Sequence, residues 1–348
     1  MSAAVDRREF LSRTALGAAA ALVVPRPEPQ VVVPTGAKAP PPPVPEPAGM
    51  FVSLPPWAVA RNVGWPEQAR LAGRVGYKGI DWAFGPARMA GLEGTRALLA
   101  EIGITATICN LPMQNPLAGE DAAFEAQLPK LGEDAWFAQF IGCRRFMIVL
   151  PAVTVNGQSK DERWAVVQRR LAAISGVLTR HDMRLGVEFL GPLMFRRARP
   201  RPGAPPPDPN APPPPPPVPF VWTLPEALRL AEASGPNIGV ILDAWHWHHS
   251  GGTVADIRAA KPERIVHVHV SDAKPMPPEE VQDNMRHLAG EGVIDLVGFF
   301  QALKAIGYQG GVAPETIGPR IPDGMAPEES ARLALEATTA MLRKAGVA

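Results

Sequence analysis

Short apolar runs rich in β-branched residues alternate with longer stretches of helical periodicity along the chain. The apolar runs predict eight strands, at residues 50–54, 79–83, 105–109, 145–150, 185–190, 239–242, 265–270 and 311–313. The periodic stretches predict a helix after each strand, at residues 66–75, 94–102, 124–141, 161–181, 224–233, 254–260, 296–306 and 327–344. Capping residues support two of these starts, since Thr223 and Asp295 directly precede predicted helices.

The alternation of strand and helix decides the predicted fold class. Parallel strands need crossover connections, and a parallel sheet that closes on itself has no exposed edge. Eight strand–helix repeats therefore predict a (β/α)8 TIM barrel. The alternative, an open doubly wound sheet, leads us to expect a glycine-rich turn after the first strand. The chain has Leu54-Pro55-Pro56-Trp57 there instead.

Proline marks the boundaries of the predicted barrel domain. Residues 25–47 contain ten prolines and residues 200–219 contain thirteen, so both are low-complexity segments. We expect a proline-rich linker at 25–49 and a barrel domain at 50–348, interrupted by a proline-rich surface loop at 196–219. Without residues 1–49 and the loop at 196–219, about 275 residues remain, close to the roughly 250 of a typical TIM barrel.

The first 24 residues have the composition of an export signal. The pair Arg7-Arg8 precedes an uncharged apolar run at residues 14–24, which is too short to span a bilayer as an ordinary helix. The pair predicts a twin-arginine-type signal peptide at 1–24, hence a partner in the twin-arginine export machinery and a periplasmic location. No small-residue cleavage pattern follows the run, so a retained N-terminal membrane anchor stays open.

Composition and charge narrow the classes of function. The chain is 46% hydrophobic and 20% charged with a net charge of +1, which gives no sign of a nucleic-acid partner. The arginines at residues 196–201 lie in the proline-rich stretch and are interpreted as part of a solvated loop. Cys109 and Cys143 are too few for a disulfide framework and lack metal-site spacing, so we expect buried, inert thiols.

The ends of four consecutive predicted strands carry side chains that can bind a metal. These residues, from the fifth to the eighth strand, are Glu188, Asp243, His269 and Glu315. The active site of a TIM barrel lies at the C-terminal ends of its strands, so the four are expected at one rim. Buried carboxylates are costly unless they are paired or bind a metal, which favours a shared divalent cation. The oxygen-rich donor set favours Mn²⁺, which we expect, or Mg²⁺; Co²⁺ and Zn²⁺ stay open.

Other residues near these strand ends have structural interpretations. His267 lies two residues before His269 and so faces the same side of the strand, which favours a hydrogen-bonded histidine of the barrel interior. His248 and His249 are interpreted as loop residues. Three large side chains fit either the core or the wall of a substrate pocket: Trp82, Met194 and Trp245.

Several segments resemble one known family. They are LGVE at 185–188, VILDAWH at 240–246, HVHVSD at 267–272, GEGVID at 290–295 and AIGYQGG at 305–311 followed by Glu315. They are similar to the xylose-isomerase-like TIM barrel superfamily of sugar phosphate isomerases and epimerases, over about residues 50–345. The resemblance implies that Glu188, Asp243, His269 and Glu315 bind the cation. It also implies that the two glutamates form a catalytic acid/base pair and that His246 contacts the substrate.

Such a site implies proton abstraction next to a carbonyl. One glutamate removes the proton, the cation stabilises the enediolate as a Lewis acid, and the other glutamate returns the proton. The expected function is a metal-dependent isomerase or epimerase acting on a sugar or keto-sugar. A lyase or dehydratase that acts on a keto-sugar or keto-glycoside by β-elimination is the alternative.

The substrate is less well defined than the chemistry. Met194 stands near the position where ketose 3-epimerases of this superfamily have an additional substrate-binding glutamate. Export favours a free sugar, a glycoside or an oxidised derivative over a phosphorylated metabolite. A carbohydrate-binding barrel without activity predicts a damaged metal set, and a nuclease predicts a basic surface, so neither fits the intact set and the near-neutral chain. A homo-oligomer stays open.

Overall fold

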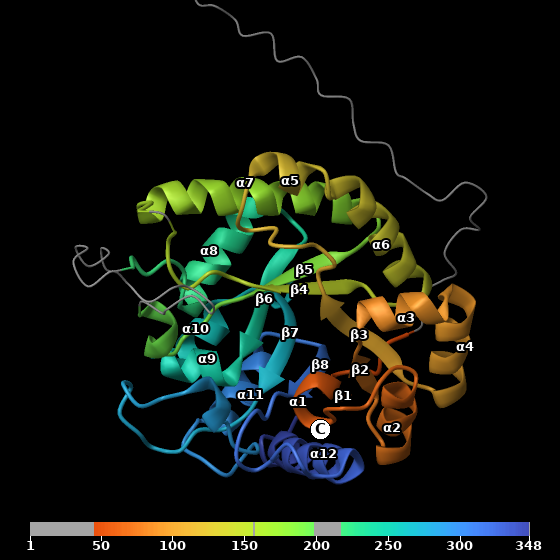
Figure 1. The fold of residues 1–348 in the computed structure, drawn as a ribbon. Helices are drawn as coiled ribbons and strands as arrows, with labels where there is room; N and C mark the ends of the chain where they lie inside the picture. The colour runs from red at the N-terminus through yellow and green to blue at the C-terminus, as the bar shows by residue number, and fades with distance from the viewer. Residues whose placement is uncertain (1–44, 156, 198–216, 348) are drawn as a thin grey trace, which may run out of the picture. The chain divides into compact units, whose positions relative to one another are not determined.

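Eight parallel strands form a closed barrel in chain order, as Figure 1 shows. The computed structural model describes residues 45–155, 157–197 and 217–347, all of which belong to one compact unit at residues 32–348. The strands are β1 (Met50–Leu54), β2 (Gly79–Asp81), β3 (Thr105–Asn110), β4 (Arg145–Val149), β5 (Arg184–Glu188), β6 (Ile238–Asp243), β7 (Ile265–Val270) and β8 (Gly310–Pro314). The predicted (β/α)8 barrel is therefore confirmed, and β8 pairs with β1 to close it.

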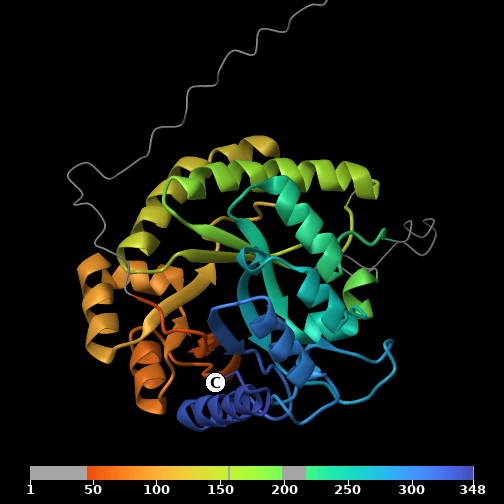
Figure 2. The ribbon, with the colours of Figure 1, turned by 180° about the vertical axis from the view of Figure 1, so that it is seen from behind.

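Helices surround the barrel, and both views show them outside the strands (Figures 1 and 2). They are α1 (Pro56–Val59), α2 (Glu67–Val75), α3 (Phe84–Ala90), α4 (Leu92–Ile102), α5 (Asp121–Glu125), α6 (Leu128–Phe140), α7 (Lys160–Thr179), α8 (Leu224–Ser234), α9 (Ala244–His249), α10 (Val254–Ala259), α11 (Leu296–Ala305) and α12 (Pro327–Lys344). Short 3-10 turns lie at Leu193–Arg196, Pro262–Arg264 and Asp283–Met285. None of the described helices is long and apolar enough to cross a membrane.

Local sequence explains where the main helices begin and end. Ser159 caps α7 in a capping box, in which its side chain accepts from the Glu162 amide and Glu162 accepts from the Ser159 amide. Helices α2 and α4 end at Gly76 and Gly103, whose positive φ angles of 103° and 73° suit glycine. These capping residues and glycines lie at the ends of the apolar helical stretches, so the sequence pattern indicated where these helices begin and end.

The barrel interior is filled by side chains from different strands. Ile108, Met147, Ile241 and Val266 come from four strands and form an apolar cluster separate from the main core. Gly186 on β5 makes room for this layer, because a Cβ there would lie 2.2 Å from Cδ1 of Ile241. The barrel is therefore a packed core, and space for a ligand has to lie at its rim.

Some predictions of local structure are wrong. The single helix predicted at 124–141 is two helices, α5 and α6. The chain turns between them at Gln127, whose side chain bonds to both backbone groups of Gln114, and Pro129 lies in the first turn of α6. Helix α9 was not predicted, and it contains His248 and His249, which are therefore not loop residues.

Both described ends of the proline-rich segment are attached to the barrel domain. Pro219 pairs with Val153 in an antiparallel bridge. The Arg196 guanidinium lies 3.7 Å from the ring centroid of Trp222, so this arginine packs on an indole instead of standing free in solvent, whereas Arg197 is exposed. The predicted signal peptide, most of the linker, Arg199, Arg201 and the centre of the loop lie outside the described residues. Cys109 and Cys143 are buried and form no disulfide, in agreement with the prediction.

Candidate metal centre

Three carboxylates and an imidazole meet at the C-terminal ends of β5 to β8. Glu188 and Asp243 are the last residues of β5 and β6, His269 lies in β7, and Glu315 directly follows β8. One ligand atom from each lies within 4.8 Å of the corresponding atoms of the others, and all four residues are buried. The structure thus brings together the four residues that the sequence placed at one rim.

His269 lies between the two glutamates. Its Nδ1 atom is 2.9 Å from Oε1 of Glu188 and 2.7 Å from Oε2 of Glu315. Burial alone opposes a positive charge on this ring, but Glu315 and Glu188 outweigh burial and raise the pKa of His269 well above its usual value. Without a cation, the two glutamates therefore stabilise a proton on the His269 ring.

Asp243 serves two purposes at the start of α9. Its Oδ1 atom accepts hydrogen bonds from the amides of Trp245 and His246, at 2.6 and 3.4 Å, and so caps this short helix. Its Oδ2 atom is 2.7 Å from Nη1 of Arg286. The cap fixes His246, predicted to contact the substrate, one turn beyond Asp243 at the same rim.

Arg286 is a functional candidate that the sequence analysis missed. Its side chain is 1% exposed, and its guanidinium contacts Asp243, Glu315 at 3.2 Å, Asp283 at 2.8 Å, and Nε2 of His246 at 3.3 Å. Burial opposes the charge, yet Glu315 and Asp243 raise the pKa of Arg286 well above its usual value. A permanently charged arginine is therefore held within the carboxylate cluster.

The loop between β7 and α11 delivers this arginine. Asp272, just after β7, accepts hydrogen bonds from the amides of Ala273, Gly290 and Ile294. The backbone of Asp272 also pairs with that of His287, the residue that follows Arg286. A single aspartate therefore folds a long aperiodic loop back onto the strand end, and this fold carries Arg286 to the rim. Asp272 is the last residue of the HVHVSD segment, so this residue was the one sequence feature that pointed to the loop.

Burial and charge set the protonation of the other groups. Burial raises the pKa of the Glu315 carboxyl to about 8, so this group is mostly protonated at neutral pH while no cation is bound. Burial opposes ionisation of Asp243 as well, but Arg286, His246 and His269 outweigh it and hold its pKa below the usual value. Burial lowers the pKa of His246, which is therefore a neutral imidazole near pH 7.

The residues present fit a divalent cation. When ionised, the three buried carboxylates stand against one guanidinium, which leaves two negative charges for a divalent cation to balance once His269 is neutral. The Oε2 atom of Glu315 is buried and forms ion-pair contacts with Nδ1 of His269 at 2.7 Å and Nη1 of Arg286 at 3.2 Å. Three buried carboxylates and one imidazole that converge in this way are a donor set that suits a divalent metal.

A cavity adjoins this cluster on the side of β1 to β4. It has a volume of about 160 Å³ and is lined by, among others, Trp57, Asp81, Trp82 and Asn110. The Trp57 ring lies 6.0 Å from the His269 ring in an edge-on arrangement, so the cavity opens next to the metal-binding atoms. Of the large side chains whose role the sequence left open, Trp82 lines this cavity and Trp245 is fully buried in the core.

The fold and the acidic rim together define a class of protein: TIM barrels with a candidate metal centre at the C-terminal ends of their strands. The chain belongs to the xylose isomerase-like TIM barrel family, whose model matches residues 69–343.

Individual relatives agree with this assignment. An inosose isomerase of Halalkalibacterium halodurans is 31% identical over 123 residues, which cover 35% of this chain and 43% of that protein. The chain therefore spans less than half the length of this curated relative. A solved xylose isomerase domain protein from Alicyclobacillus acidocaldarius is 26% identical and superposes with a TM-score of 0.73, covering 85% of this chain and 99% of that one. The structure of IolI protein with a bound zinc atom has the same fold, with a TM-score of 0.68 at 19% identity over 85% of this chain and 99% of that one.

Proposed function

We propose that the protein is a divalent-metal-dependent isomerase or epimerase of a sugar or keto-sugar. The observation that carries the proposal is the convergence of Glu188, Asp243, His269 and Glu315 at the rim of a barrel of this family. The relative named as an inosose isomerase supports an isomerase that acts on a small polyhydroxylated ketone.

The proposed cation is held by those four side chains. When bound, it acts as a Lewis acid on a substrate carbonyl. The oxygen-rich donor set favours Mn²⁺, while the zinc atom in the IolI structure supports Zn²⁺ as the alternative.

Glu188 and Glu315 are the proposed acid/base pair. Each has a carboxylate oxygen close to the Nδ1 atom of His269, at 2.9 and 2.7 Å, so a substrate held beside this atom has both carboxyl groups within reach. One of them removes the proton next to the carbonyl, and the other returns a proton to the enediolate. Return on the opposite face gives epimerisation, and return at the neighbouring carbon gives isomerisation.

Arg286 and His246 contribute fixed donors to this step. The guanidinium stays charged and points into the carboxylate cluster, where it stabilises negative charge that develops on a substrate oxygen. The neutral His246 ring contacts the same guanidinium and offers a hydrogen-bond partner to a substrate hydroxyl. Trp57 and Trp82 supply apolar walls of the neighbouring cavity, which suits the C–H faces of a sugar.

We also propose that the enzyme is exported. The arginine pair and the short apolar run at the N-terminus support transport by the twin-arginine route to the periplasm, with a retained anchor as the alternative. A substrate met outside the cytoplasm is a free sugar, a glycoside or an oxidised sugar.

Proton exchange with solvent tests the proposal. The Mn²⁺-loaded protein is incubated in D₂O with free ketoses, inososes and keto-glycosides, and the products are followed by NMR. We expect deuterium at the carbon next to the carbonyl without loss of a substituent, and loss of exchange in Glu188→Gln and Glu315→Gln. The matched control is Glu336→Gln, which changes an exposed glutamate of α12.

Two results would contradict this proposal. Full activity in both active-site variants would remove the acid/base pair from the mechanism. Release of an aglycone or of water would instead support the alternative, a lyase that uses the same proton abstraction and then expels a leaving group.

A further inference from the structure

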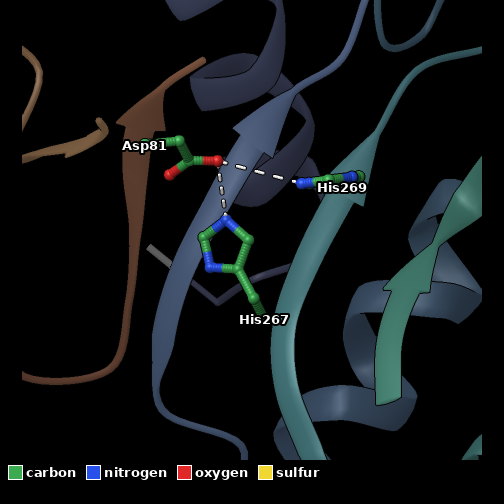
Figure 3. Close-up of side chains that lie close together, drawn as sticks. All are labelled: Asp81, His267 and His269. Carbon is green, nitrogen blue, oxygen red and sulfur yellow. Dashed lines mark hydrogen bonds and ion pairs between the residues drawn. The ribbon is translucent and has the colours of Figure 1, made fainter. Parts of the chain in front are cut away.

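A second group of buried polar residues shares His269 with the candidate metal centre. Figure 3 shows Asp81 at the end of β2, with its carboxylate turned toward His267 and His269 of β7. Oδ2 of Asp81 is 3.1 Å from Nε2 of His267 and 3.8 Å from Nε2 of His269. All three residues are buried, and the sequence analysis assigned no role to Asp81.

The two ring nitrogens of His269 face different partners. Nδ1 points to Glu188 and Glu315, the proposed cation ligands, whereas Nε2 points to Asp81 (Figure 3). A neutral imidazole carries one proton, and only the nitrogen without it can bind a metal. At 3.8 Å the Asp81 carboxylate lies beyond hydrogen-bond distance from Nε2, but its charge favours the proton on that atom, which leaves Nδ1 to bind the cation.

Asp81 is itself fixed from the other side. The Ser53 hydroxyl donates to its Oδ1 atom at 2.6 Å, and Ser53 also contacts the Thr107 hydroxyl at 2.9 Å. Nε2 of His267 lies 3.1 Å from Oδ2 of Asp81, and its Nδ1 atom has no hydrogen-bond partner among the described residues, so the tautomer with the proton on Nε2 donates to Asp81. Both oxygens of Asp81 therefore have donors that come from β1 and β7, which hold the carboxylate in one orientation.

Two strand glycines make room for this network. A Cβ on Gly79 would lie 2.3 Å from Oγ1 of Thr107 and 3.2 Å from Oγ of Ser53. A Cβ on Gly311 would lie 2.7 Å from Cε1 of His267. Both glycines lie in buried strands, and neither has a positive φ angle, so space and not backbone conformation accounts for them.

A second cation between Asp81, His267 and His269 is the competing explanation. His269 would then have to bind one metal through each nitrogen, which requires loss of both ring protons. Asp81 already receives a hydrogen bond at each oxygen, and the part of the chain that the structure describes offers three protein ligands here. Hydrogen bonds from Ser53 and His267 satisfy Asp81, and its 3.8 Å contact with His269 Nε2 is a charge contact, so no second metal is needed to explain the cluster.

We propose that Asp81 is a positioning residue that orients the His269 ring, with Nε2 toward Asp81 and Nδ1 toward the cation. The inference rests on the proposed metal centre, and Asp81 acts on the cation only through the imidazole. Residues that contact a metal ligand without binding the metal themselves alter metal affinity by about 10- to 100-fold when they are replaced.

Cation binding to the full-length protein tests this proposal. Mn²⁺ affinity and stoichiometry are measured by competition with a chelator for wild type, Asp81→Asn and Asp81→Ala. The matched control is Asp295→Asn at the cap of α11, where asparagine caps as well as aspartate. Thermal unfolding of the metal-free proteins reports any loss of folding separately.

We expect one Mn²⁺ per wild-type chain and an affinity about 10- to 100-fold lower in Asp81→Asn, with the control unchanged. In protein labelled with ¹⁵N-histidine and loaded with diamagnetic Zn²⁺, the His269 Nε2 signal should be that of a protonated nitrogen in the wild type. Restored kcat at saturating Mn²⁺ with an unchanged KM for substrate would support positioning over substrate contact.

Three results would overturn the inference. They are unchanged affinity in both Asp81 variants, a raised KM with unchanged affinity, and two Mn²⁺ per wild-type chain with one lost on substitution of Asp81. A wild-type protein that binds no cation would instead refute the proposed function, and this inference with it. Glu188→Gln removes a proposed ligand, whereas Asp81→Asn removes a positioning residue. If Glu188→Gln lost Mn²⁺ binding while Asp81→Asn bound Mn²⁺ normally, the proposed metal centre would stand and only the inference about Asp81 would fail.

Discussion

Replacement of Arg286 by methionine tests how charge is balanced at the rim. The guanidinium is fully buried and contacts Asp243 and Glu315, so its removal leaves the buried Asp243 carboxylate without its ion-pair partner. Breaking a buried ion pair by removing one partner costs about 3–5 kcal/mol. We expect a loss of this size in the free energy of unfolding of metal-free Arg286→Met.

The same substitution should cost less when a divalent cation is bound. The cation supplies positive charge to the same carboxylates, so part of the lost interaction is replaced. Urea titration of wild type and variant, each with chelator and with saturating Mn²⁺, measures both losses. Arg332→Met is the control, because Arg332 forms an exposed pair with Glu336 that is worth at most about 1 kcal/mol. A loss as small as the control's, or an equal loss with and without Mn²⁺, would refute this account of the rim.

Three further predictions follow from local structure. Gly311→Ala places a Cβ 2.7 Å from Cε1 of His267 and should destabilise the protein by about 1–3 kcal/mol in urea titration. Gly94→Ala, with open space around it in α4, should stabilise the protein by up to about 1 kcal/mol, and the reverse order would contradict the packing argument. Ser159→Ala removes the capping box of α7 and should cost about 1 kcal/mol while Mn²⁺ affinity stays unchanged, so a weaker Mn²⁺ affinity would count against a purely local role. Burial raises the pKa of Glu315 to about 8, so below pH 8 a cation has to displace its proton; calorimetric Mn²⁺ affinity should fall as pH decreases from 8 to 6, and a flat profile would speak against this pKa.

The strands were the strongest signal in the sequence. Strands of a parallel barrel are buried on both faces and therefore form continuous apolar runs, as in Ile265–Val270. The division of the predicted helix at 124–141 could not be read from periodicity. It depends on the contact between the Gln127 side chain and the backbone of Gln114, and apolar positions on both sides continue the same pattern.

Some residues of the candidate site could likewise be predicted from the sequence, and others could not. Glu188, Asp243 and Glu315 were predictable because the end of a strand fixes where its last side chain lies in a barrel. Arg286 was not, because it lies in an aperiodic loop whose path depends on the bonds that Asp272 makes to distant backbone amides. Asp81 stands at a strand end too, but its partner His267 is 186 residues away, and no spacing rule connects them.

The central claim is that Glu188, Asp243, His269 and Glu315 hold one divalent cation. Anomalous diffraction from crystals of the Mn²⁺-loaded protein tests it most directly. The account predicts a single anomalous peak per chain, bonded to all four side chains and absent from Asp243→Asn crystals grown in the same way. A peak between Asp81 and His267, or no peak at the rim at full Mn²⁺ saturation, would contradict it.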